Sequence, residues 1–455
     1  MPNTVNPLYG RTLTNKGTVN LKKVRNLFSA EYMPYKVMAV VSTVFLVLAF
    51  VMDHPNDVFG GFMRIIQSRS ILFTDYVAIG GIGAALLNVS IVGFVTVISF
   101  IIKGIKPCGA NIMAFWLTIG FSFFGKNVFN MIPLTFGVWL YAKFRKSSFA
   151  EHYIAALLVA TLSPAISEIA FLGMFNRVLE IIVGILLGFL IGFIFPIMSY
   201  LSIRMHSGFN LYNMGFAGGL IAMIIASIMK NMGLNIVRGN HWSTGNNFFF
   251  AVLLYSFSGL MFIAELLSDL AAKKTIQMIK RDIKEFVKIH EHSGKLSTDF
   301  YNLHGKSVYV NMAVLCSFAT TVVLVLGADL NGPTIAGILT MTGFGSFGKH
   351  IKNVAPVVAG AIAAVYLNRW EPAAPPNILA ILFSSGLAPI AGAFGPVWGI
   401  IAGFLHVNIA GFIGDINGGL NLYNNGFAAS FVAMFLLPII NIFKPDLYSY
   451  HMHHR

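Results

Sequence analysis

Two lysines lie within apolar stretches of this sequence, where a positive charge needs a specific reason to be present. Lys126 belongs to IGFSFFGKNVFNMIP at residues 119–133, and Lys349 belongs to TGFGSFGKHIKNVAP at residues 342–356. An ammonium group at the centre of a bilayer costs at least about 2.5 kcal/mol, and this cost usually accompanies a water-filled cavity, an acidic partner or an anionic ligand. The alternative is that both lysines lie in loops on opposite membrane faces and extend their charge into water.

Two further motifs combine amide and tyrosine side chains, GFNLYNMGFA at residues 208–217 and GLNLYNNGFA at residues 419–428. One Asn in each motif is expected to cap the helix that follows. Two amides and a Tyr exceed what a cap requires, and amides can bind a polar solute without demanding a charge. Besides the two lysines, the predicted substrate-binding residues are Asn130, Asn353, Asn210, Tyr212, Asn213, Asn421, Tyr423 and Asn424.

Glu168 is a carboxylate inside an apolar segment, and its counterpart in the second half of the chain is an alanine. An intramembrane carboxylate can pair with Lys126, Lys349 or His350, or it can carry a proton. A structural ion pair explains Glu168 equally well. We therefore name Glu168 and His350 as candidates for proton or ion coupling.

No motif in the sequence indicates an enzyme. Gly343, Gly345 and Gly348 match G-x-G-x-x-G without a strand before them, and there is no H-E-x-x-H, G-x-S-x-G or Walker loop. The histidines of the terminal HMHHR tail are expected to fray rather than to bind metal. We expect no catalytic residue, no metal and no cofactor.

Composition requires membrane helices to position these residues. Of 455 residues 56% are hydrophobic and 11% charged, and the mean hydropathy is +0.74, whereas soluble domains carry about 25% charged residues. Lipid must therefore be the solvent for much of the surface. The net charge of +14 reflects short basic loops rather than nucleic-acid binding. The expected partners are the lipid bilayer and a small-molecule or ion substrate, and a homo-oligomer is left open.

The apolar segments form two sets of about seven. Several reach the roughly 20 residues that span a bilayer, whereas 110–124, 333–347 and 378–394 are short and interrupted by Gly or Pro. Breaks in such segments must be shielded by protein or line a cavity. The predicted divisions are a basic segment at 1–35, membrane repeats at 36–233 and 247–443, an amphipathic segment at 268–297 and a tail at 444–455.

An internal repeat relates the two sets. At an offset of 223, Gly125, Lys126, Asn130 and Pro133 match Gly348, Lys349, Asn353 and Pro356, and Asn88 matches Asn311. Because each repeat has an odd number of segments, the second copy enters the membrane upside down. The number stays odd even if 110–144 forms a re-entrant hairpin and does not span. The predicted fold is an all-α, polytopic membrane helix bundle of two inverted-topology repeats with short broken or re-entrant helices.

Basic residues predict the orientation of the chain. With the N-terminus inside, 24 of the 31 lysines and arginines face the cytoplasm, as the positive-inside rule expects. Both termini are then cytoplasmic, residues 54–74 are outside and 271–300 inside, in a bacterial inner membrane. Residues 270–290 alternate basic and apolar residues at helical spacing, which favours a helix on the anionic inner leaflet over a site for a regulatory partner.

The doubled N-L-Y-N-x-G-F-A and F-G-K motifs resemble an uncharacterised bacterial family of multipass membrane proteins, a domain of unknown function, which implies no activity. The layout of two inverted halves is distantly similar to that of urea transporters, but their Leu-Pro-x-x-Thr-x-Pro-Phe signature is absent, so no residue roles are carried over. The architecture favours a channel or secondary transporter for a small anion or polar solute, with its site at the interface of the repeats. The alternatives are a membrane-embedded enzyme and a non-transporting sensor or scaffold subunit.

Overall fold

The computed structural model describes residues 30–453 except 73, 235, 237–238, 240 and 272–275. Most of the predicted basic segment at 1–35 therefore lies outside the described residues. The described chain is helical, with three isolated β-bridges and no strand among its described residues. The predicted all-α class is confirmed.

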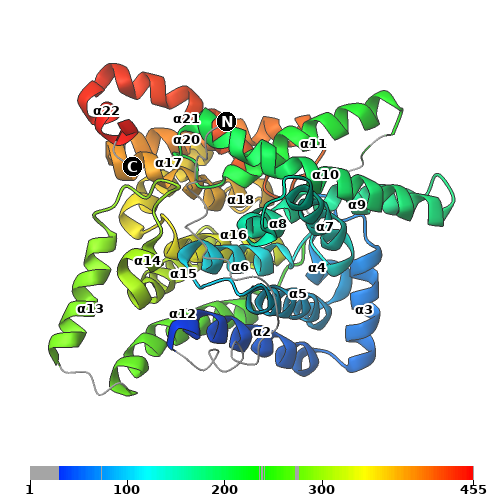
Figure 1. Ribbon diagram of the computed structural model, residues 1–455, viewed down its shortest axis with the longest axis horizontal. Helices are drawn as coiled ribbons and strands as arrows, with labels where there is room; N and C mark the ends of the chain where they lie inside the picture. Colours follow the sequence, from blue (N-terminus) through cyan, green and yellow to red (C-terminus); the bar gives the residue numbers. More distant parts are fainter. Residues whose placement is uncertain are drawn as a thin grey trace. The chain divides into compact units, whose positions relative to one another are not determined.

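The chain forms two compact units, and the helices of both are coloured along the sequence in Figure 1. Unit 1 comprises the described parts of 1–200, 217–243 and 416–422, and unit 2 comprises those of 201–216, 244–415 and 423–455. The first half of the chain contains η1 (Ala30–Tyr32), α2 (Met33–Met52), α3 (Pro55–Gln67), α4 (Tyr76–Gly80), α5 (Ile82–Lys103), α6 (Gly109–Phe121), α7 (Val128–Phe144), η2 (Phe149–His152), α8 (Tyr153–Leu158), η3 (Val159–Leu162), α9 (Ser163–Ala170), α10 (Arg177–His206) and α11 (Asn213–Asn231).

The second half repeats this order. It contains α12 (Asn247–Ala271), α13 (Ile276–Ile289), α14 (Phe300–His304), η4 (Gly305–Ser307), α15 (Val308–Val325), α16 (Gly332–Gly343), η5 (Phe344–Ser346), α17 (Ile351–Leu367), α18 (Pro375–Ser384), η6 (Ser385–Leu387), α19 (Ala388–Phe394), α20 (Pro396–Ile416), α21 (Asn424–Phe443) and α22 (Pro445–His453).

Length and composition allow nine helical segments among the described residues to cross a membrane. The predicted short segments are also present: α6 has 13 residues and α16 has 12, about 20 Å at 1.5 Å per residue, well short of a bilayer core of about 30 Å. The nine candidates are Met33–Met52, Ile82–Lys103, Phe149–Ala170, Arg177–His206, Asn213–Asn231, Phe300–Val325, Pro375–Phe394, Pro396–Ile416 and Asn424–Phe443.

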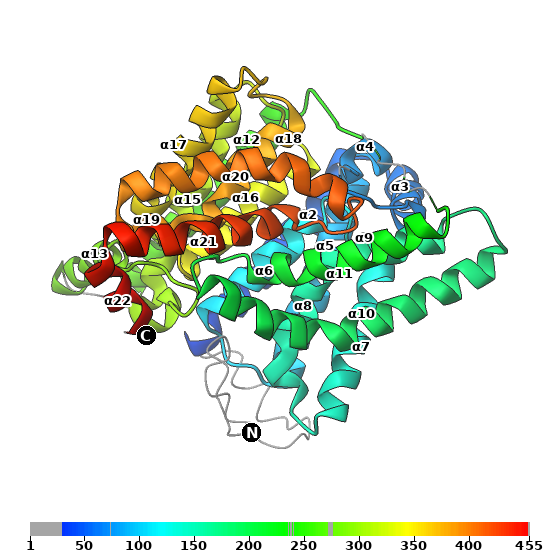
Figure 2. The ribbon, with the colours of Figure 1, turned by 90° about the horizontal axis from the view of Figure 1, so that it is seen from above.

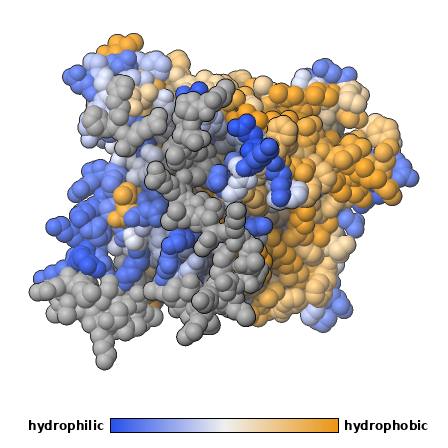
Figure 3. Space-filling model, viewed as in Figure 1, coloured by the Kyte–Doolittle hydropathy of each residue, from blue (hydrophilic) through white to orange (hydrophobic). Residues whose placement is uncertain are grey.

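Burial separates inner helices from outer ones. Every residue of α6 and of α16 is buried, whereas α10 exposes a row of large apolar side chains that includes Leu186 and Leu190. Apolar side chains on the outside suit contact with lipid, because soluble proteins rarely expose so large an apolar patch to water. Figure 3 shows such apolar residues covering a broad area of the face in view.

The core of unit 2 is built where its later helices meet (Figure 2). Its buried apolar cluster joins Val357 of α17, Leu387 of η6, Phe394 of α19, Ala402 of α20 and Val432 of α21. Small residues in this cluster let the helices approach closely, as is usual for membrane helix packing. This packing surrounds η6 and the short helix α19.

Equivalent hydrogen bonds recur in the two units. The side-chain amides of Asn88 and Asn311 bond the backbone at equivalent interruptions between short helices. The backbone N–H of Leu72 donates to the carbonyl of Gly419 in unit 1, and that of Leu296 donates to the carbonyl of Gly208 in unit 2, both at 3.0 Å. Unit 2 includes Asn210, Leu211 and Tyr212 from the first half of the sequence, and unit 1 includes Asn421 and Leu422 from the second half. The compact units thus exchange these short segments relative to the divisions predicted at 36–233 and 247–443.

Candidate functional site

The helical backbone of unit 2 is interrupted between η5 and α17, and this break contains Lys349. The side-chain amide of Asn311 donates to the carbonyls of Gly345 and Lys349, each at 2.7 Å. Gly348 has φ +92°, and a Cβ there would lie 2.9 Å from Leu211 Cδ2 and 2.8 Å from the Gly294 carbonyl oxygen. Both the left-handed backbone and the close packing require glycine at this position.

The side chain of Lys349 is completely buried. Its Nζ donates to the hydroxyls of Tyr212 and, at 2.9 Å, of Ser385. Nζ also lies 4.3 Å from the centroid of the Tyr212 ring and 4.8 Å from that of Phe344, close enough for cation–π attraction when the amine is protonated. Within the described part of the chain no carboxylate pairs with Lys349. Lys349, Tyr212 and Ser385 are called the Lys349 site below.

Lys126 occupies the equivalent break in unit 1. The amide of Asn88 donates to the carbonyls of Ser122 at 2.7 Å and Lys126 at 2.9 Å, and Gly125 has φ +77°. The side chain of Lys126 is again buried, but among the described residues its Nζ donates to a single acceptor, the Leu157 carbonyl, at 3.4 Å. The interpretation that both lysines extend into water from loops does not describe this structure.

The two breaks differ in polarity. The N–H of Leu211 donates to the carbonyl of Gly386, and the N–H of Leu422 donates to that of Thr161, each at 2.9 Å. Gly386 and Thr161 therefore occupy equivalent positions. The residues directly before them, Ser385 and Ala160, are then equivalent as well. Lys126 therefore has an alanine where Lys349 has a hydroxyl, which makes the Lys349 site the more polar of the two.

Asn130 builds the break around Lys126. Its Oδ1 accepts the N–H of Asn127 at 2.9 Å, and its Nδ2 donates to Gly125 and Ser167, both at 3.0 Å. Asn127 returns a bond to the N–H of Asn130, completing a capping box at the start of α7. The amide is fully used by the fold, and its predicted part in substrate binding stays a prediction.

Asn353 and His350 repeat this arrangement at the start of α17. His350 Nδ1 accepts the N–H of Asn353 at 3.2 Å, and Asn353 donates to the carbonyl of Gly348 at 3.0 Å. His350 Nε2 lies 2.9 Å from the carbonyl of His292, so an Nε2 proton and an Nδ1 lone pair satisfy both contacts. The predicted role of His350 in coupling stays a prediction, and both ring nitrogens are engaged by the backbone.

The Asn-Tyr motifs divide between the two units. Asn210 Oδ1 accepts the N–H of Tyr212 at 2.8 Å, and its Nδ2 donates to Gly426 and Ser430 at 2.9 and 2.7 Å. In unit 1, Asn421 Oδ1 accepts the hydroxyl of Thr161 at 2.6 Å. Asn213 Oδ1 lies 2.9 Å from Nε2 of His206, and the rings of Tyr212 and Tyr423 lie 4.6 Å apart. Asn424 is buried at the start of α21.

Of the residues predicted for the site, the structure therefore brings Tyr212 and Lys349 into direct contact. Ser385 completes the site but was absent from the predicted set. The signal that would have found it is its position: it is one of two adjacent serines in the short segment 378–394, which was already predicted to be broken.

Glu168 pairs with a residue outside the candidates considered for it. Arg69, in the loop between α3 and α4, donates from Nε to Oε2 of Glu168 at 2.9 Å and from Nη2 to Oε1. The expected partners Lys126, Lys349 and His350 are not the ones the fold supplies, and the structural ion pair is the alternative that the contacts favour. The predicted role of Glu168 in proton or ion coupling stays a prediction.

Comparison with known proteins identifies one family. A family model described as "Protein of unknown function (DUF1576)" matches residues 54–231 and 278–442. No curated protein and no solved structure matches the chain.

Proposed function

The chain belongs to the DUF1576 family, and we propose that it is an integral membrane channel or secondary transporter for a small anion that binds at the Lys349 site. The observation that carries this proposal is the buried ammonium of Lys349, which has hydroxyl and aromatic neighbours but no carboxylate partner among the described residues. An anion that reaches the ammonium removes the cost of the uncompensated charge.

The hydroxyls of Tyr212 and Ser385 strengthen the case for an anion. They lie 3.0 Å from each other and both contact Lys349. The Ser385 hydroxyl donates to the carbonyl of Leu382 at 2.6 Å, so a ligand there meets the amine of Lys349 and the hydroxyl of Tyr212, which can rotate to donate. The amides of Asn130, Asn353 and Asn210 are consumed by capping and packing contacts. A neutral polar solute was expected at the Asn-Tyr motifs, and the contacts of Asn210, which belongs to one of them, support the anion over the neutral solute.

We also propose that the two repeats are inserted in opposite orientations. Support comes from the odd number of predicted segments and from the matching breaks, which are the features that mark substrate sites in inverted-repeat transporters.

Cysteine labelling tests this orientation. We expect Asn56→Cys and Ser297→Cys, each made in a Cys108→Ser background, to react with a membrane-impermeant maleimide from opposite sides of the membrane. Both positions are exposed, and the remaining Cys316 is buried. Reaction of both from the same side would contradict the inversion.

Solute flux into proteoliposomes tests the function. Stopped-flow light scattering should show protein-dependent entry of at least one small anion from a series of chloride, nitrate, formate and phosphate, with valinomycin and potassium to balance charge. Glycerol and urea serve as neutral controls, and liposomes without protein give the background. If only the neutral solutes enter, the substrate is a neutral polar solute and not an anion. No entry of any solute would favour the enzyme or scaffold alternatives.

A further inference from the structure

The outer face of α13 presents apolar and basic side chains together. Ile283 and Val287, one helical turn apart, are 59% and 54% exposed. Lys280, Arg281 and Lys284 are exposed beside them. Arg281 lies 3.9 Å from a carboxylate oxygen of Asp282 and its side chain stays 64% exposed. Figure 3 shows polar residues gathered where Figure 1 places α13.

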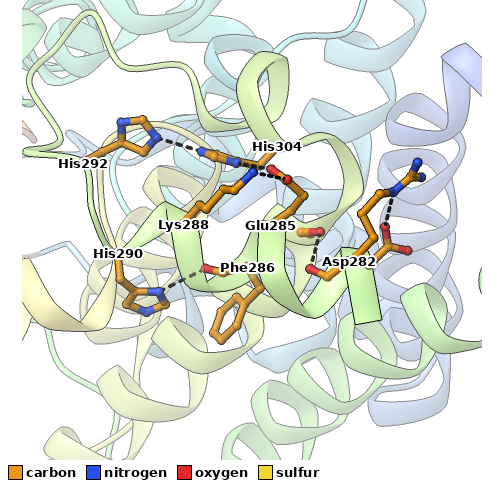
Figure 4. A network of polar contacts seen from close by, with 9 residues as sticks. Asp282, Glu285, Phe286, Lys288, His290, His292 and His304 are labelled. Carbon is orange, nitrogen blue, oxygen red and sulfur yellow. Dashed lines mark hydrogen bonds and ion pairs between the residues drawn. The ribbon is translucent and has the colours of Figure 1, made fainter. Parts of the chain in front are cut away.

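The inner face of α13 anchors the helix to unit 2 through a polar network (Figure 4). Glu285 accepts from Lys288 Nζ at 2.6 Å and lies 2.9 Å from Nδ1 of His304, whose Nε2 lies 2.8 Å from Nε2 of His292. The hydrogen bond from Lys288, and then that from His304, lower the pKa of Glu285 to about 2. The carboxylate is therefore ionised at neutral pH and compensates the ammonium of Lys288, whereas no carboxylate of the described residues pairs with Lys280 or Lys284.

Helix α3 in unit 1 provides an internal comparison. An offset of 224 aligns its Phe59 and Met63 with Ile283 and Val287, and these two residues are likewise 56% and 50% exposed. In Figure 1, α3 runs across the ends of α2 and α5, and α13 runs at a steep angle to α12. The basic residues are not repeated: where α13 has Lys280, Arg281 and Lys284, α3 has Asn56, Asp57 and Gly60.

We propose that α13 lies in the plane of the membrane on an anionic lipid surface, with Ile283 and Val287 inserted among the lipids and Lys280, Arg281 and Lys284 bound to their phosphates. An apolar pair bordered by cations on an exposed helix face is the pattern of interfacial helices. Charge complementarity selects anionic lipid as the occupant, because each basic residue near such a surface strengthens binding by roughly fivefold. Helix α3 makes the apolar contact with a lipid surface and has no preference for anionic lipid.

The experiment places an environment-sensitive fluorophore on α13 of the full-length protein. Val287→Cys in a Cys108→Ser background is labelled, and the protein is reconstituted in nanodiscs of phosphatidylcholine with increasing phosphatidylglycerol. We expect the emission to shift to shorter wavelength as the phosphatidylglycerol fraction rises. Adding salt should reverse part of the shift, since the attraction is screened.

Two matched variants decide the outcome. The triple variant K280Q/R281Q/K284Q should lose the response, a combined weakening on the order of 100-fold if the three contributions add. A label at Met63→Cys on α3 should sit in a nonpolar environment regardless of phosphatidylglycerol. The proposal is overturned if the α13 label ignores phosphatidylglycerol, or if the α3 label responds equally. The salt dependence requires none of the three Gln substitutions, so it remains decisive if the triple variant does not fold.

Discussion

Replacing Lys349 by Met should strongly reduce anion flux and at the same time raise the thermal stability of the protein. The side chain of Lys349 is buried without a carboxylate partner among the described residues, and its removal leaves Tyr212 and Ser385 bonded to each other at 3.0 Å. No polar group is orphaned, so the folded state loses only the cost of the buried charge, about 1–3 kcal/mol. Loss of the charged donor should lower the flux of the permeant anion by at least about tenfold.

The equivalent substitution in unit 1 is the matched control for this experiment. Lys126→Met should stabilise the protein in the same way, because Lys126 is equally buried and makes one long contact. Its effect on flux should be smaller, since Ala160 replaces the hydroxyl of Ser385 there. Thermal unfolding in detergent and the light-scattering assay give the two readouts. A Lys349→Met variant that unfolds more easily and keeps its flux would make Lys349 a structural residue.

The breaks themselves could be predicted from the sequence, because their parts repeat. Gly125 and Gly348 recur with the following lysines at one offset, and the structure gives both glycines positive φ angles. A repeated glycine before a repeated lysine in a short apolar segment is a local signal. The backbone requirement and the hydrogen bonds that follow from it are local as well.

The partners of the charged side chains could not be predicted, because they come from distant parts of the chain. Glu168 lies 99 residues from Arg69, and Lys349 lies 137 residues from Tyr212. The sequence places Arg69 in the outer segment 54–74, where its charge only contributes to the predicted orientation of the chain. Nothing in the spacing of Glu168 distinguishes an arginine of that loop from a lysine of the breaks as its partner.

The asparagines at the helix starts show a second limit on predicting the site from the sequence. Asn130 and Asn353 have the residue type and position expected of a solute-binding group, and the same type and position suit a capping box. The structure shows the capping contacts in both units. Sequence pattern alone does not separate the two roles, because both require an amide at the start of a helix beside a break.

The largest loss of stability is expected at Asn88 and Asn311, which hold the two breaks closed. Each amide donates to two carbonyls, those of Ser122 and Lys126 in unit 1 and of Gly345 and Lys349 in unit 2. Asn311→Ala removes both donors from carbonyls that no continuous helix satisfies. Each buried group left unpaired costs about 1–3 kcal/mol, so the variant, with two such carbonyls, should lose about 2–6 kcal/mol of unfolding free energy. Chemical unfolding in detergent micelles, followed by tryptophan fluorescence, measures this loss.

Thr320→Ala on the same helix as Asn311 provides the control. Its hydroxyl donates at 2.8 Å to the carbonyl of Cys316 one turn earlier, a carbonyl within the α-helix whose backbone bond remains after the substitution. The loss of unfolding free energy should then stay below about 1 kcal/mol. Because the two units hold their breaks with equivalent bonds, Asn88→Ala should be as costly as Asn311→Ala. If Asn311→Ala costs no more than Thr320→Ala, the amide does not hold the break, and the position of Lys349 depends on other contacts.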